Sequence, residues 1–150
     1  MINSVPKLWI RDPNSLPTRV EGNRTITKGP LIDLALLQEH LASGKLDVDN
    51  DEQFWPATPK CRKDLTKYNW TYAQVGKMLL SLRLGRKPKG DYKKSEWCAV
   101  DGDEMYPCDV YELPFDELRG QRNNNGLTVY LKFSLGKDGE LMLVLVSCHI

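Results

Sequence analysis

The most regular pattern in the chain is an alternation of apolar and polar residues between positions 127 and 135. The apolar residues occupy every second position, at Leu127, Val129, Leu131, Phe133 and Leu135. A period of two over this length is typical of a β-strand with one face on a core and the other face open. The open face of this predicted strand carries Tyr130 and Lys132.

A second strand is predicted to return alongside the first one and complete a β-hairpin. Asp138-Gly139 favours a tight turn, because glycine readily adopts a positive φ. The residues that follow, 140–150, have almost no polar positions before the chain reaches Cys148-His149. This pattern predicts a central strand that is covered on both faces.

The face on which His149 lies depends on the register of this hairpin. If Leu135 pairs with Glu140, His149 shares the face of Tyr130. A turn with one bulged residue moves it to the opposite face. The sequence alone leaves both registers open.

Three earlier segments have the three-to-four-residue spacing of amphipathic helices. They cover residues 30–44, 58–67 and 71–85, and the first and third end at glycines that suit a helix stop. Thr71 and Gln74 form the pattern of a capping box at the start of the third helix. The apolar stripe of this helix is expected to belong to the core.

A strand is also predicted for residues 106–115, which alternate in the same way. Pro107 and Pro114 cannot donate backbone hydrogen bonds, so this strand is expected at an edge of the sheet or with a bulge. A short strand could form at residues 46–48. Helices followed by a mostly antiparallel sheet define the α+β class.

Residues 1–29 contain several prolines and no clean period, so they are expected to form an extended N-terminal arm before one domain at 30–150. Short strands could pair within this arm, around Arg19-Val20 and Thr25-Ile26. A chain of 150 residues is long enough for a single domain with a sizeable core.

The composition narrows the classes of function. The net charge is +1, so any attraction for nucleic acid must be local. The four cysteines are widely spaced and form no CxxC, which indicates neither a zinc site nor a disulfide framework. No apolar stretch resembles a signal peptide or a membrane span, so a cytoplasmic protein without a membrane partner is expected.

Positive charge is concentrated between residues 77 and 94, where seven lysines and arginines are accompanied by one acid, Asp91. Such a run is often a solvated loop. It could also bind phosphates beside Tyr92, Trp97 and the open face of the hairpin.

The chemistry that remains after the common motifs are excluded is acid–base chemistry on this open face. The chain has no motif of a serine hydrolase, a zinc protease or a nucleotide-binding loop. Cys148 and His149 are adjacent on a strand, so their side chains point to opposite faces and cannot readily act as nucleophile and base. Lysine, tyrosine and histidine on a sheet face suit metal-independent RNA cleavage, in which the ribose 2′-hydroxyl attacks the neighbouring phosphate. No metal or cofactor is expected.

Three short motifs occur in order before the last strand: DYKKS at 91–95, CDVY at 108–111 and YLK at 130–132. This arrangement resembles the MqsR family of bacterial toxins, and the resemblance extends over about residues 30–150. It implies a RelE-like α+β fold and an endoribonuclease that cleaves messenger RNA. It also implies a cognate antitoxin protein as a partner besides RNA.

The resemblance places the catalytic residues at Lys94, Tyr130 and His149, with Lys93 as the alternative to Lys94 if the register slips by one. The family usually has lysine where His149 stands, and imidazole exchanges protons near neutral pH more readily than lysine. The family has glutamine where Cys108 stands. A thiol cannot replace the paired donor and acceptor of an amide.

The RNA-binding residues are expected among the cations of the basic segment and the hairpin: Arg83, Arg86, Lys87, Lys89, Lys93 and Lys132. Tyr92 and Cys108 could line the site, although Cys108 also fits a small buried apolar residue. The alternative to an enzyme is a non-catalytic RNA-binding or protein-binding module on the same fold. The change from glutamine to Cys108 favours this alternative.

Overall fold

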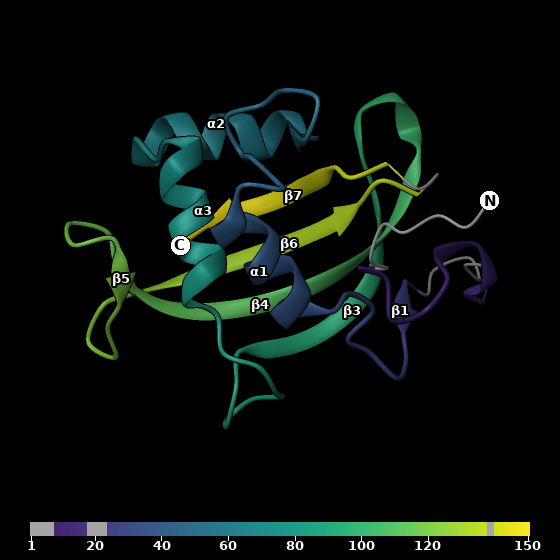
Figure 1. The fold of residues 1–150 in the computed structure, drawn as a ribbon, viewed down its shortest axis with the longest axis horizontal. Helices are drawn as coiled ribbons and strands as arrows, with labels where there is room; N and C mark the ends of the chain where they lie inside the picture. The colour runs from purple at the N-terminus through teal and green to yellow at the C-terminus, as the bar shows by residue number, and fades with distance from the viewer. Residues whose placement is uncertain (1–7, 18–23, 138–139) are drawn as a thin grey trace.

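One β-sheet runs through the computed structural model, which describes residues 8–17, 24–137 and 140–150 (Figure 1). Within these residues the sheet has seven strands in the order β1-β3-β4-β6-β7-β2, and β5 pairs with β4. All pairs are antiparallel except β2 with β7, which is parallel. The strands are β1 (Thr25–Ile26), β2 (Phe54–Pro56), β3 (Tyr92–Ala99), β4 (Met105–Asp116), β5 (Gln121–Arg122), β6 (Leu127–Leu135) and β7 (Leu143–His149).

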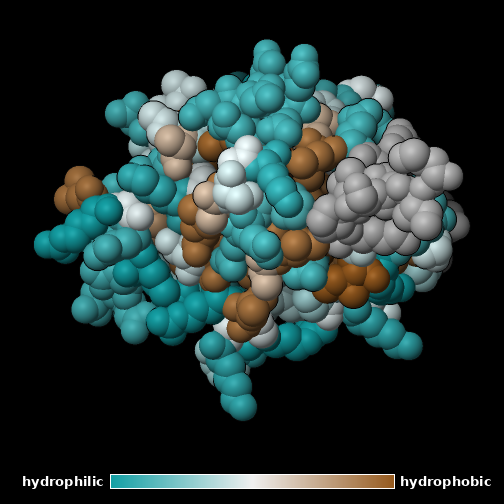
Figure 2. All heavy atoms as spheres, viewed as in Figure 1, coloured by the Kyte–Doolittle hydropathy of each residue, from teal (hydrophilic) through white to brown (hydrophobic). Residues whose placement is uncertain are grey.

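The α-helices cover one face of the sheet (Figure 1). They are α1 (Leu34–Ser43), α2 (Pro59–Tyr68) and α3 (Tyr72–Ser81), and short 3₁₀ helices occupy Pro13–Ser15 and Asp101–Asp103. Leu37 and Leu79 of the helices are fully buried in one core with Leu131 and Phe133 of the sheet. The outer side of this layer is mostly hydrophilic, with apolar patches between the helices (Figure 2).

The α+β class is therefore confirmed, but the order of elements differs from the prediction. The helices lie between strands rather than before them, because β1 precedes α1 and β2 lies between α1 and α2. Both of these strands are too short to show a period in the sequence. No strand forms at residues 46–48. In the described ranges, no helix is long and apolar enough to cross a membrane.

Each α-helix begins after a polar residue whose side chain accepts a backbone hydrogen bond. Asp33, Thr58 and Thr71 occupy these N-cap positions, and Gly44 ends α1 with a φ of 82°. The capping box of α3 is only half formed, because the Gln74 side chain donates to a carbonyl after β4 instead of returning to the cap.

Two helix boundaries differ from the prediction for identifiable reasons. α1 begins after Asp33 and not at Pro30, because Leu31 and Ile32 are extended and donate their N–H groups to Asp109. α3 ends at Ser81, before the predicted residue 85, since Leu82 is already extended. α2 extends one residue beyond its predicted end.

β4 is a central strand, so the predicted edge position is wrong. The predicted alternative, a bulge, is not found in β4 either, because the irregularity in its pairing with β3 lies at Lys93. The alternation of β4 is as predicted. Pro107 and Pro114 are tolerated because, at each of these positions, only one of the two neighbouring strands pairs with β4. Pairing of β4 with β6 begins at Asp109, and pairing with β3 ends at Tyr111. The missing N–H groups therefore break no hydrogen bond of the sheet.

β6 and β7 form the predicted hairpin, with a longer connection than expected. Leu135 pairs with Leu143 and not with Glu140. The predicted turn at Asp138-Gly139 lies outside the described residues. Buried side chains on both faces confirm that β7 is covered on both sides.

A bulge in β7 decides where the end of this strand faces. The register changes by one residue after Lys132, which pairs with Ser147, so Val146 is the additional residue. Beyond the bulge, Tyr130 pairs directly with His149. The two side chains therefore share a face.

The N-terminal segment is part of the same core where the structure describes it. Leu8, Leu16 and Ile26 are buried in the cluster that the helices cover. β1 pairs with β3, whereas the predicted partner strand at Arg19-Val20 lies outside the described residues.

The second face of the sheet has a smaller apolar cluster at one end. Its members are Trp55, Ala57, Cys98, Val100, Tyr106, Cys108, Met142, Val144 and Val146. Among the described residues, no α-helix packs over the rest of this face (Figure 1), which carries charged and aromatic side chains.

Candidate functional site

The polar part of the second sheet face brings together all three predicted catalytic residues, Lys94, Tyr130 and His149. We use the name open face for eight residues from four strands and one loop: Lys87, Lys93, Lys94, Glu96, Glu112, Tyr130, Lys132 and His149. Their positions follow from the strand register and from two bulges.

A row of three polar side chains crosses the centre of the open face. Glu112 of β4 pairs with Tyr130 of β6, which pairs with His149 of β7. The rings of Tyr130 and His149 are stacked, with centroids 4.9 Å apart and planes inclined by 17°. The row thus offers a carboxylate, a phenol and an imidazole in adjacent positions.

A second bulge, in β3, places two consecutive lysines beside this row. Tyr92 pairs with Tyr111 and Lys94 with Val110, which leaves Lys93 as the additional residue. The ammonium group of Lys93 lies 5.9 Å from the centroid of the Tyr130 ring, within the range of a cation–π contact. A regular strand would have sent one of these lysines to the buried face.

Two carboxylates on the open face each bridge two lysines. Glu112 contacts Lys87 at 2.8 Å and Lys93 at 3.3 Å. Glu96 contacts Lys132 at 2.7 Å and Lys94 at 3.0 Å. All four lysines of the open face are therefore held by a carboxylate.

These ion pairs shift the protonation equilibria of the carboxylates. The hydrogen bond from Lys87, followed by that from Lys93, lowers the pKa of Glu112 below its ordinary value. Burial acts to raise the pKa of Glu96, but the hydrogen bonds from Lys132 and Lys94 lower it overall. Both groups are therefore anionic at neutral pH and poor proton acceptors.

Lys132 is the most enclosed cation of the site. Its side chain is 15% exposed, and its ammonium group lies 5.8 Å from the centroid of the Tyr130 ring. Burial acts to lower the pKa of Lys132, but the hydrogen bond to Glu96 raises it overall. Two ammonium groups, those of Lys93 and Lys132, therefore lie close to the Tyr130 ring.

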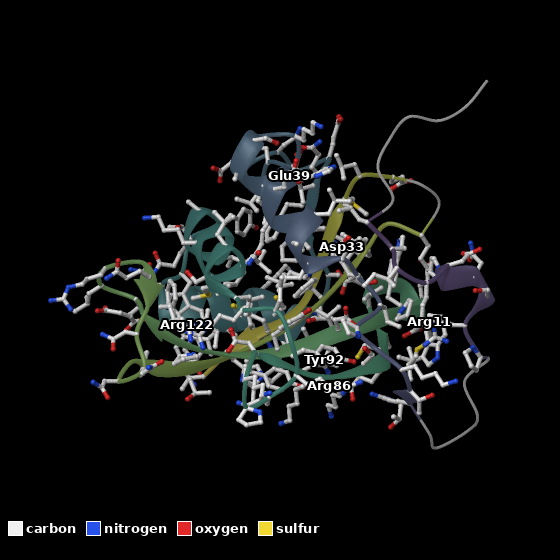
Figure 3. All side chains as sticks on the ribbon, turned by 60° about the horizontal axis from the view of Figure 1, so that its bottom comes forward. Arg11, Asp33, Glu39, Arg86, Tyr92 and Arg122 are labelled. Atoms are coloured by element: carbon white, nitrogen blue, oxygen red, sulfur yellow. The ribbon has the colours of Figure 1, made fainter. Side chains whose placement is uncertain are left out.

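Several other predicted residues lie away from the open face. Tyr92 is 2% exposed in the helix-covered core, where its hydroxyl group contacts Ser95. Arg86 stacks over the Tyr92 ring at 5.0 Å and donates to the Gly29 carbonyl (Figure 3). The Arg83 backbone N–H donates to Asp91.

Two further predicted residues contribute no group to the open face. Lys89 is exposed in the loop before β3. Cys108 is fully buried in the small apolar cluster, where its thiol donates to the Tyr106 carbonyl. Burial raises the pKa of Cys108, so it presents no thiolate to the site.

The sequence reasoning missed Glu96 and Glu112, although each directly follows a motif that it used, DYKKS and CDVY. The basic segment was counted only to Lys94, and Glu96 stands two residues further along the same strand. Had residues 92–99 been recognised as a strand, its period of two would have placed Glu96 beside Lys94. Glu112 follows CDVY and shares the face of Cys108 and Val110 by the same rule.

The residue types of the site are compatible with anion binding and proton transfer. In the part of the chain that the structure describes, no group of three or more histidine, cysteine, aspartate or glutamate residues could hold a metal ion. Comparison of the chain with family models, curated proteins and solved structures finds no match. The MqsR resemblance therefore remains an expectation based on short motifs.

Proposed function

We propose that the chain is a metal-independent endoribonuclease with a RelE-like fold, the toxin of a toxin–antitoxin pair that cleaves messenger RNA in the cytoplasm. The observation that carries this proposal is the stacked pair of Tyr130 and His149, with the ammonium groups of Lys93 and Lys132 at 5.9 and 5.8 Å from the centroid of the Tyr130 ring. The antitoxin would be the protein partner, as the MqsR resemblance implies.

The proposed reaction needs two proton transfers and a stabilised phosphate. The ribose 2′-oxygen forms a bond to phosphorus, and the bond from phosphorus to the 5′-oxygen breaks. The imidazole of His149 takes the proton of the 2′-hydroxyl, and the Tyr130 phenol gives a proton to the leaving 5′-oxygen. The lysines stabilise the negative charge that develops on the phosphoryl oxygens.

The motif favours Lys94 as the catalytic lysine, but the contacts of Tyr130 favour Lys93 as well. The ammonium groups of Lys93 and Lys132 lie within 6 Å of the Tyr130 ring centroid, whereas Lys94 contacts Glu96. We therefore include both Lys93 and Lys94 in the proposed site.

Two observations favour a second candidate, a non-catalytic RNA-binding or protein-binding module. The position at which the MqsR family has glutamine is the fully buried Cys108, which leaves the open face without that amide. In addition, each lysine of the face is paired with a carboxylate, so a phosphate must compete with Glu96 or Glu112.

A cleavage assay distinguishes the two candidates. Purified protein is incubated with a defined single-stranded RNA in EDTA, and the ends of the products are identified. An enzyme of the proposed type leaves a 2′,3′-cyclic phosphate and a 5′-hydroxyl. Binding without cleavage would favour the module, and 5′-phosphate ends or an absolute need for Mg²⁺ would exclude the mechanism.

Matched variants connect the activity to the row. Tyr130→Phe keeps the ring stack but removes the proton donor, so we expect a loss of about 10²-fold or more in single-turnover rate. His149→Ala should lower the rate, because it removes the imidazole that takes the proton of the 2′-hydroxyl. Lys137→Ala, which changes an ion pair with Glu104 instead, is the control and should cleave at the wild-type rate.

A further inference from the structure

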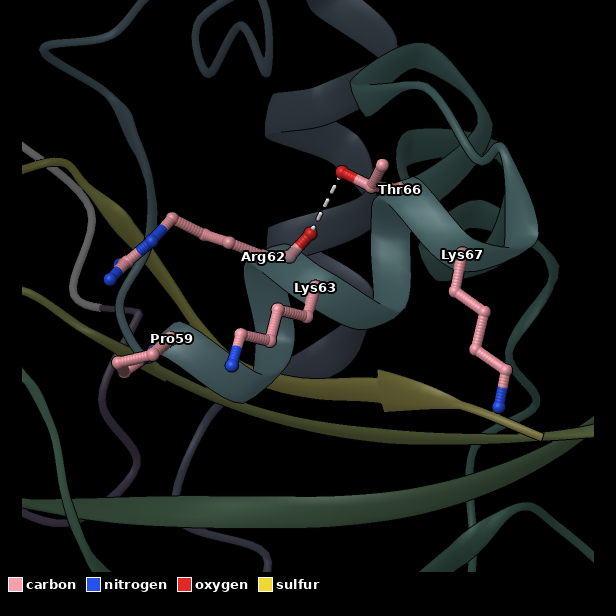
Figure 4. Close-up of a pocket in the computed structure, with 5 residues that line it drawn as sticks. All are labelled: Pro59, Arg62, Lys63, Thr66 and Lys67. Atoms are coloured by element: carbon pink, nitrogen blue, oxygen red, sulfur yellow. Dashed lines mark hydrogen bonds between the residues drawn. The ribbon is translucent and has the colours of Figure 1, made fainter.

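A second basic surface lies on the outer side of α2 and shares no residue with the open face. Positions 59, 62, 63, 66 and 67 follow helical spacing and line a hollow of about 560 Å³. Its lining consists of Pro59, Arg62, Lys63, Thr66 and Lys67 (Figure 4). Lys63 and Lys67 extend from the same side of the helix, and Arg62 points elsewhere (Figure 4).

The cations of α2 divide into paired and unpaired ones. Lys60 contacts Asp64 at 2.6 Å, and Arg62 contacts Asp101 at 2.7 Å. Lys63 and Lys67 are exposed and form no ion pair with any carboxylate in the described residues. The Lys67 ammonium group lies 5.3 Å from the centroid of the neighbouring Tyr68 ring.

This arrangement contrasts with that of the open face, where all four lysines are held by Glu96 or Glu112. A phosphate that binds an open-face lysine must displace or share a carboxylate. A phosphate that binds Lys63 or Lys67 displaces only small counterions and water. The release of counterions is the main source of affinity between proteins and nucleic-acid backbones.

α2 lies beside the end of β7 that carries His149. β2 pairs with β7 only as far as Leu145, and beyond that point the Thr58 hydroxyl donates to the Val146 carbonyl. α2 packs directly against β7 (Figure 1). α2 covers the opposite face of the sheet, so a strand of RNA that leaves the row at His149 reaches α2 by passing around the β7 edge, where pairing with β2 has ended.

We infer that Lys63 and Lys67 form a second contact for the RNA backbone, next to the row at which the chain would be cleaved. This inference rests on the proposed function for the identity of the ligand, a single-stranded RNA longer than the nucleotides at the scissile bond. The two lysines hold backbone phosphates by charge without reading the sequence.

The test compares two double variants of the full chain in RNA binding at several salt concentrations. Lys63→Gln/Lys67→Gln removes the proposed contact. Lys28→Gln/Lys45→Gln removes two exposed lysines from other elements and serves as the control. For a single-stranded RNA of about twenty nucleotides, the slope of log affinity against log salt should fall by about 1.4 in the first variant, at about 0.7 per lost contact.

Cleavage of a dinucleotide substrate separates this inference from the proposed function. The dinucleotide occupies only the row, so Lys63→Gln/Lys67→Gln should cleave it at the wild-type rate. An unchanged salt slope with intact cleavage would overturn the inference alone. A reduced slope with no cleavage by any form of the protein would overturn the enzymatic function alone.

An acidic protein partner would give a different result. If the first variant bound RNA normally but lost binding to polyglutamate, the α2 surface would be assigned to an acidic polypeptide and the RNA contact would be refuted.

Discussion

The buried carboxylate of Asp109 makes the most stringent prediction about stability. Asp109 is fully buried on the helix-covered side of β4, and no cation contacts it in the described residues. It accepts hydrogen bonds from the N–H groups of Leu31 and Ile32, at 2.9 to 3.0 Å, and from the Ser95 hydroxyl at 2.6 Å. These bonds attach the segment before α1 to the sheet.

Removing the side chain leaves three donors without an acceptor. Each unsatisfied buried donor costs about 1–3 kcal/mol, so Asp109→Ala should lower the free energy of unfolding by at least about 3 kcal/mol. Asp109→Asn should cost much less, about 1 kcal/mol, because one oxygen still accepts from the backbone. The amide group can then donate to the Ser95 hydroxyl.

The buried Asp109 carboxyl also predicts that the stability of the fold depends on pH. Burial raises the pKa of Asp109 above its ordinary value of 3.8, despite the hydrogen bonds that lower it. A carboxyl with a raised pKa in the folded state binds its proton more tightly when folded, so its contribution to stability is fully present below the unfolded pKa. This contribution is lost as the pH rises through the folded pKa.

Urea denaturation of the wild type and both variants, from about pH 3.5 to 7, tests this reasoning. The stability of the wild type relative to Asp109→Asn should fall as the pH rises and then become constant. Two results would refute it: a loss below about 1 kcal/mol in Asp109→Ala, or a wild-type advantage that grows with pH.

Two other substitutions are expected to have different effects, one on stability and one on RNA binding. Arg122→Met leaves the buried carboxylate of Asp91 without its bidentate partner, at 2.6 and 2.9 Å, and should destabilise the fold by about 3–5 kcal/mol in the same denaturation assay. Normal stability of that variant would show that the pair contributes little. Glu112→Gln releases Lys87 and Lys93, so RNA binding should become tighter and more salt-dependent, while stability changes by less than about 1 kcal/mol. Weaker RNA binding by this variant would mean that the bridged lysines need their carboxylate to reach the phosphate.

Elements with a complete local signal were predicted from the sequence. The hairpin of β6 and β7 follows from strict alternation, and α2 follows from Thr58 and Pro59 at its start. β3 was interpreted as a basic loop, because its residues do not alternate. The Lys93 bulge interrupts the period, and pairing with β1 and β4 stabilises the strand instead.

The candidate site was predictable only where its residues lie in regular strands, because bulges leave no signal in the sequence. Tyr130 and Lys132 have a fixed face because they lie in the regular part of β6. His149 joins them through a bulge at Val146, which no local pattern indicates. Tyr92 was expected beside them because it precedes two lysines, but the bulge at Lys93 places it on the other face.

The two bulges also determine how the open face can vary. In a regular strand, a substitution changes the side chain at one position but does not move the neighbouring side chains to the other face of the sheet. Gain or loss of a single residue at Lys93 or Val146 reverses the phase of every side chain on one side of that point. Small differences in chain length at these two positions would therefore exchange whole sets of groups between the solvent and the core. The number of residues at these two bulges, more than their identity, determines which side chains the sheet exposes on its open face.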